Sequence, residues 1–228
     1  MDRLSGRNLK QKVLELLKAK DFCSSLEQLK QFPGKIVINP LLSFLLDLDD
    51  LVKWRAVAAL GVVVSLMAET DMEAARVIMR RLMWSLNDES GGIGWGAPEA
   101  MSEIMAKNDK IAQEYYTILI SYLDEDGNHL EYEALQKGLI WGVARLSTIR
   151  PDLMKPAAVY LYKYLDSNDA SIRGLSAFGL GLLRARDSID HLNRLMNDYS
   201  EFQTFFGNEL KIFKVSDFAE KAVSLINE

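Results

Sequence analysis

Hydrophobic side chains recur along most of the chain at the three- and four-residue spacing of amphipathic helices. Short polar turns with Asp, Asn or Ser separate these runs, and such side chains accept hydrogen bonds from the unpaired N–H groups that begin a helix. We expect Pro40 and Pro151 near helix starts. The pattern predicts an all-α chain with helices near 8–20 and 23–32, then pairs near 40–46/51–68, 71–86/94–107, 109–123/130–147, 152–165/169–184 and 187–198/216–227.

The second helices of these pairs share a pattern. Val52–Gly61 and Ile172–Gly181 both read aliphatic, basic, two free positions, two small residues, one free, one small, Leu and Gly. Weaker copies begin at Ile93, Leu135 and Val215, so the starts lie 41, 42, 37 and 43 residues apart. A period near forty residues is typical of stacked helix pairs.

A helix pair cannot bury its apolar face alone, so neighbouring pairs stack, and small residues let their backbones approach closely. We expect Ala59 and Gly179 to face neighbouring pairs in this way. The sequence predicts a right-handed α-α superhelix of about five pairs at 36–228, preceded by an N-terminal helical cap at 1–35, within one domain overall.

The repeated segments, each preceded by an acidic turn, resemble HEAT repeats, close to the HEAT-like units of phycobilisome lyases. The resemblance covers residues 36–228 and implies an armadillo-type solenoid, a fold used mostly by binding scaffolds. Some HEAT-like proteins are DNA glycosylases, and that relation implies a basic concave channel with an acidic catalytic residue among aromatic side chains.

Charge and cysteine content narrow the classes of function. The chain has 27 basic and 32 acidic residues, and residues 1–35 hold eight of the basic and four of the acidic ones. The remaining net charge of -9 on residues 36–228 makes nucleic acid an improbable partner. Cys23 is the lone cysteine, which we expect on the apolar side of the cap, and with two histidines no Cys/His metal site and no cofactor are expected. No leader or membrane span is recognised, so we expect a cytoplasmic protein.

Tryptophans and carboxylates gather around Asn87–Glu103, a stretch longer than the repeat requires. This mixture could hold a ligand, or it could seal the interface between repeats. The candidate residues are Trp84, Asp88, Glu89, Trp95, Glu99 and Glu103.

Aligning the repeats gives a second set of candidates. Trp54 and Trp95 share the third position of the second helix, and Glu99, Trp141 and Phe178 share the seventh, one turn further along the same face. Arg55 lies beside this aromatic stripe, and Glu103 and Arg145 share the eleventh position. The stripe could line a concave groove or fill gaps between unequal repeats.

Asp124–His129 begins like a calcium loop, but His129 stands where the loop needs glycine and Leu135 where it needs a bidentate glutamate. We therefore interpret this segment as a polar turn between helices.

Together these observations favour a non-enzymatic scaffold that holds a protein or peptide on its concave face, with the acidic turns selecting basic partners. The alternative is a small-ligand binder or an enzyme, DNA glycosylase-like or lyase-like, that uses the carboxylates and tryptophans around Asn87–Glu103.

Overall fold

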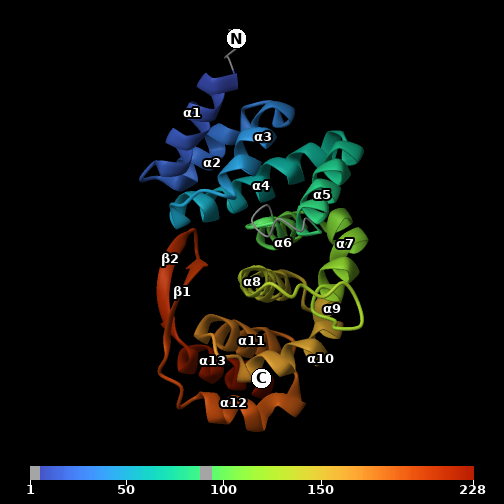
Figure 1. Cartoon of the computed structure of the whole chain (residues 1–228), viewed down its shortest axis with the longest axis vertical. Coiled ribbons are helices and arrows are strands. Elements are labelled where there is room, and N and C mark those ends of the chain that lie inside the picture. Colours follow the sequence, from blue (N-terminus) through green and yellow to red (C-terminus); the bar gives the residue numbers. More distant parts are fainter. Residues whose placement is uncertain (1–5, 88–93) are drawn as a thin grey trace. The chain divides into compact units, whose positions relative to one another are not determined.

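The computed structural model describes residues 6–87 and 94–228, which are mostly helical and form two compact units, 1–108 and 109–228. Within each unit, helices follow one another as antiparallel pairs joined by short turns (Figure 1). The prediction of a mostly helical repeat structure is confirmed.

The first unit consists of six helices in its described part. Long α4 packs against α2, α3, α5 and α6, and its side chains from Ala56 to Gly61 are all buried. Helix α4 is long and apolar enough to cross a membrane, but buried core helices of soluble proteins also meet these two criteria. Most of the apolar stretch of α4 is buried within the protein. The helices are α1 (Gly6–Lys18), α2 (Phe22–Lys30), α3 (Gly34–Phe44), α4 (Asp50–Thr70), α5 (Met72–Leu86) and α6 (Ala97–Lys107).

In the second unit α11 packs between α8 and α13, and α7 and the short helical segments α9, α10 and α12 pack around them. Its elements are α7 (Asp109–Ser121), α8 (Glu133–Ile149), α9 (Pro151–Met154), η1 (Lys155–Ala157), α10 (Ala158–Leu161), η2 (Tyr162–Asp166), α11 (Ala170–Leu182), η3 (Arg186–Ser188), α12 (Ile189–Leu195), β1 (Glu201–Phe206), β2 (Glu209–Lys214) and α13 (Val215–Asn227).

The antiparallel hairpin β1–β2 was not predicted; the sequence suggested only a long loop there. Its two-residue turn has positive φ at Gly207 (63°) and Asn208 (67°), the geometry that matches the twist of a tight hairpin. Phe202 is buried against α11, where a Cβ on Gly174 would lie 2.5 Å from the Phe202 ring. The glycine therefore makes room for the hairpin.

Three local predictions are wrong. Helix α3 begins at Gly34 rather than near residue 40, so Pro40 lies inside the helix. The helix expected at 152–165 is broken into α and 3₁₀ segments around Pro156, which lacks the N–H that a continuous helix needs. Cys23 is exposed rather than packed on the apolar side of α2.

Aspartates cap the two helices that carry the strongest repeat pattern, as predicted. Asp49 accepts from Leu51 N and Val52 N at the start of α4, at 3.1 and 3.4 Å. Asp169 accepts from Ser171 N and Ile172 N at the start of α11, at 2.9 and 3.1 Å.

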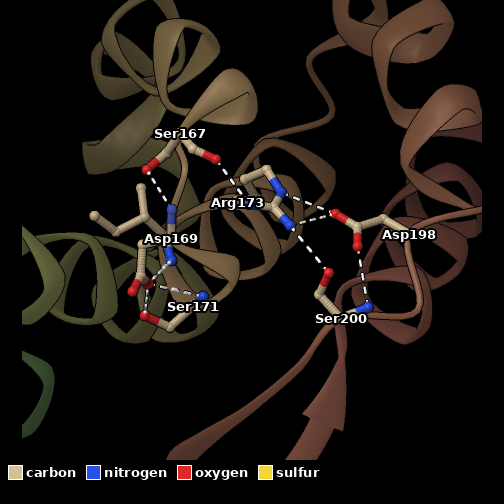
Figure 2. A network of polar contacts seen from close by, with 7 residues as sticks. Ser167, Asp169, Ser171, Arg173, Asp198 and Ser200 are labelled. Atoms are coloured by element: carbon tan, nitrogen blue, oxygen red, sulfur yellow. Dashed lines mark hydrogen bonds and ion pairs between the residues drawn. The ribbon is translucent and has the colours of Figure 1, made fainter.

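Figure 2 shows how the turn before α11 is joined to the turn of the next repeat. The Arg173 guanidinium donates to Asp198 Oδ2 through Nε at 2.8 Å and to the Ser167 carbonyl through Nη1 at 2.7 Å. Asp198 also accepts from Ser200 N at 3.0 Å. Arg173 occupies the basic position of the repeat pattern, so that position ties successive turns together.

Candidate functional site

Helices α4 and α6 lie parallel and very close in the first unit. A Cβ on Gly61 would lie 2.6 Å from Glu103 Cγ and 3.1 Å from the Glu103 carbonyl oxygen. One turn further on, Ser65 Oγ donates to the carbonyl of Lys107 at 2.9 Å. This alignment places Glu99 and Glu103, which are one helical turn apart on α6, beside α4. Trp95, expected at the third position of this helix, lies instead in the turn before it.

Glu99 is the chemically unusual member of this pair of carboxyl groups. Its side chain is on the first turn of α6 and only 6% exposed, and Oε2 has no hydrogen-bond partner among the described residues. Burial raises the pKa of this carboxyl, and the positive charge of Lys53 opposes that shift without cancelling it. Burying a carboxylate oxygen without a hydrogen-bond partner costs folding free energy. A cationic group that bound there would reduce this cost.

Trp95 precedes α6 and remains 41% exposed. The turn that holds it depends on Gly96, whose φ of 77° suits glycine and whose missing Cβ leaves space for Leu45. This places a half-open indole in the turn that leads into α6, four residues before Glu99 in the sequence.

Trp54 lies on the first turn of α4 and is half-buried. Lys53 Nζ is 5.4 Å from the centroid of the Trp54 ring and 3.3 Å from Asp50 Oδ1. The sequence analysis placed Lys53 in the repeat pattern but did not name it as a site residue. Its position next to Trp54 in the sequence was the signal that could have identified it.

Glu103 is also buried, at 6% exposed, and lies 3.7 Å from Lys107 Nζ one turn along α6. Its backbone and Cγ fill the space that Gly61 leaves open. Glu103 therefore packs against Gly61 and also places a second carboxyl group one helical turn from Glu99.

Arg55 makes contacts within the first unit. Its Nη1 donates to the Leu17 and Ala19 carbonyls at 2.7 and 2.8 Å, and its guanidinium lies 4.8 Å from the Phe22 ring centroid. Because the last carbonyls of a helix have no intrahelical partner, Arg55 closes the C-terminal end of α1. Arg55 therefore has a structural role: it holds the C-terminal end of α1 against α4.

Trp84 is 80% exposed on the outer helix α5, on the same helical face as Val77 and Arg81. Asp88 and Glu89, the remaining loop candidates, lie outside the described residues.

Trp141 and Arg145 belong to α8 in the second unit. Trp141 is 7% exposed and donates from Nε1 to the Phe205 carbonyl of β1 at 3.0 Å. Phe178 stacks on Phe218 with ring centroids 5.0 Å apart. In this unit the predicted aromatic stripe packs against the hairpin and α13, while Arg145 is half-buried.

Two of the turn aspartates, which were expected to select basic partners, lie close to lysines of the chain itself. Asp169 Oδ2 lies 2.7 Å from Lys137 Nζ, and Asp49 lies 4.0 Å from Lys18 Nζ. Burial tends to raise the pKa of Asp169, but hydrogen bonds from Lys137, Ser171 and the backbone outweigh it and leave the pKa lowered. Within the described ranges, no group of three or more His, Cys, Asp or Glu side chains is placed to hold a metal ion.

Comparisons with known proteins support the fold. No family model matches the chain. An uncharacterized protein of Archaeoglobus fulgidus is 29% identical over 194 residues, which cover 85% of this chain and 95% of that protein. A designed armadillo repeat protein is 19% identical, with a TM-score of 0.52 over 96% of this chain and all of the other.

Another designed armadillo repeat protein, solved in complex with the peptide (KR)4, is also 19% identical, with a TM-score of 0.53 over 96% of this chain and 99% of the other. At this level of identity the likeness is one of fold. The chain thus has an armadillo/HEAT-like repeat structure.

Proposed function

We propose that this protein is a non-enzymatic scaffold that binds a protein or peptide segment, and that Glu99 captures a basic side chain of that segment beside Trp95. The observation that carries the proposal is the buried Glu99 carboxyl with its unpartnered Oε2. A lysine or arginine side chain supplies the donor and the positive charge that this oxygen lacks.

Aromatic side chains support the same function. Trp95 is half-open, and a cation next to an indole ring is favoured by about 0.5–2 kcal/mol. Lys53 already lies over the Trp54 ring in this unit, which illustrates the arrangement with the chain's own cation. Glu103, one turn beyond Glu99, adds a second negative charge along α6.

The fold agrees with this use. Armadillo-type repeats present rows of parallel inner helices, and a designed protein of this fold was solved with the basic peptide (KR)4. We extend the proposal to a basic segment as partner, and to the cytoplasm as the place of action.

The experiment is a fluorescence-anisotropy titration with a labelled (Lys-Arg)4 peptide. Glu99→Gln keeps the shape of the side chain and removes its charge, so we expect at least tenfold weaker binding. Glu69→Gln is the matched control, because Glu69 is an exposed carboxylate at the end of α4, and it should change the affinity less than twofold.

Trp95→Ala should weaken the same titration at least fivefold. Equal, small losses for Glu99→Gln and Glu69→Gln would point to a general charge effect and would contradict the proposal. The proposal would also be contradicted if the wild-type protein bound the (Lys-Arg)4 peptide no better than an acidic peptide of the same length.

A further inference from the structure

A polar concavity lies in the second unit. It has a volume of about 360 Å³ and is open to solvent at the turns before α8 and α11. Residues from the α7–α8 loop, the start of α8, η2 and the turn after η2 line it, among them Glu125, His129, Gln136, Lys163, Tyr164 and Asp166.

Tyr164 is 7% exposed, and its hydroxyl has no hydrogen-bond partner in the described part of the chain. Burial, with a contribution from the negative charge of Glu125, raises its pKa to about 12, so the phenol stays protonated. Its neighbour Tyr160 differs, because that hydroxyl donates to Asp124 Oδ2 at 3.2 Å. A buried hydroxyl without a hydrogen-bond partner is destabilising, and a bound ligand that hydrogen-bonds to it would offset that cost.

His129 is the second side chain with an unpartnered buried atom here. Gln136 Nε2 donates to the Leu130 carbonyl at 2.8 Å and lies 3.4 Å from His129 Nε2. In the tautomer that lets His129 Nε2 accept from Gln136, Nδ1 carries the proton. Nδ1 has no partner among the described residues, so this edge offers a donor to an oxygen atom.

The rim of the concavity carries two carboxylates, Glu125 and Asp166, and one lysine, Lys163, whose Nζ lies 5.2 Å from the Tyr164 ring centroid. Glu125 and Asp166 have side chains 70% and 75% exposed; Glu125 contacts Lys163 Nζ at 2.6 Å, and Asp166 Oδ1 contacts His191 Nε2 at 2.8 Å. Asp166 Oδ2 makes no hydrogen bond to a described residue. Residues 109–228 carry 13 basic and 18 acidic side chains, so this unit holds the entire net charge of -5.

We propose that this concavity binds a guanidinium group whose carrier also presents a carbonyl or carboxylate oxygen, that is, arginine, either free or as a residue of a peptide. In this proposal the planar guanidinium, whose five N–H donors form a rigid fork, donates to Asp166 Oδ2 and to the Tyr164 oxygen. The His129 Nδ1–H then donates to the carrier's oxygen. A lysine ammonium is a poorer match, since its donors radiate from one point. The site does not depend on the function proposed for Glu99.

Calorimetric titrations of the full chain test this with four probes: free arginine, N-acetylarginine methylamide, agmatine and N-acetyllysine methylamide. We expect one or both arginine compounds to bind, the lysine compound to bind at least tenfold more weakly, and agmatine, which lacks the oxygen, to bind more weakly than arginine. Preference for the free or the blocked compound identifies the source as a metabolite or a peptide residue.

Tyr164→Phe removes only the unpartnered hydroxyl. We expect at least tenfold weaker arginine binding with an unchanged or higher melting temperature, because the free protein loses no hydrogen bond. Tyr160→Phe is the matched control, and it should leave the affinity unchanged while lowering the melting temperature, because a hydrogen bond is lost.

Glu99→Gln should also leave arginine binding at this site unchanged, which separates the inference from the peptide scaffold. Absence of binding by the wild-type protein at millimolar arginine would overturn the inference. Equal affinity of wild type and Tyr164→Phe, or equal binding of the arginine and lysine compounds, would overturn it as well.

Discussion

Gly181 of α11 lies directly against the backbone of Ala222 in α13: a Cβ on Gly181 would be 2.4 Å from the Ala222 Cα. Gly61 has the same position in its repeat and the same relation to Glu103. The final glycine of the pattern is therefore the point at which parallel helices of successive repeats touch.

Gly181→Ala should destabilise the protein by about 1–3 kcal/mol, because neither backbone can yield without moving a helix. Gly179→Ala should cost much less, since its added Cβ meets only the flexible end of Leu161 at 2.9 Å. The expectation that Gly179 faces a neighbouring repeat is thus corrected: it faces α10 of its own pair. Urea unfolding of both variants checks the order, with Gly6→Ala as a control where no atom lies within 4 Å. Equal losses at Gly179 and Gly181 would contradict this account.

Trp141 should prove to be a structural residue. Trp141→Phe retains the ring but loses the hydrogen bond to Phe205, which we expect to cost about 1–2 kcal/mol. Trp141→Ala should cost about 3–5 kcal/mol, since the side chain is buried. Thermal melts test both values, and an unchanged melting temperature for Trp141→Ala would favour the open-groove hypothesis instead.

Stability should depend on pH through Glu99. Because its pKa is raised in the folded state, its contribution to stability is full below its unfolded pKa and is lost as the pH rises through the folded value. Each unit of that shift corresponds to about 1.4 kcal/mol. Glu99→Gln, which cannot ionise, should therefore be more stable than wild type at pH 8 and similar to it at pH 4. Chemical denaturation at both pH values tests this; a variant less stable than wild type at pH 8 would show that Lys53 outweighs burial.

Removing the Arg55 guanidinium should loosen the N-terminal helices. Arg55→Ala leaves the Leu17 and Ala19 carbonyls without their donor, which we expect to cost about 2–3 kcal/mol. Hydrogen exchange should speed up in α1 and α2 more than in α5, with Arg7→Ala, an exposed arginine of α1, as the control. If Arg55→Ala and Arg7→Ala gave the same exchange rates in α1 and α2, the structural role of Arg55 would be contradicted.

Most of the helices and their pairing could be predicted from the sequence, because helical spacing and the positions of small residues are local signals. Asp49 and Asp169 were recognisable as caps for the same reason. The hairpin was missed although Gly207 and Asn208 separate two equal segments, since the repeat period left that stretch as a long loop between the two helices of the last pair.

The candidate site was less predictable, because adjacent residues on a helix point in different directions. Arg55 and Trp54 are neighbours in sequence, yet Arg55 is directed to the end of α1 while Trp54 meets Lys53. The burial of Glu99 and the orphan hydroxyl of Tyr164 depend on packing between segments, which no spacing in the sequence encodes.

The hydrogen bond between Trp141 and Phe205 also has a bearing on solubility. In a hairpin with a two-residue turn, Phe205 directs its carbonyl away from β2, toward the side where another chain could add a strand. The indole occupies that carbonyl, and on the opposite edge β2 carries Glu209, Lys211 and Lys214, charges that disfavour strand addition. Trp141 thus shields a two-stranded ribbon from edge-to-edge aggregation, and its loss would expose a nucleus for intermolecular sheet growth.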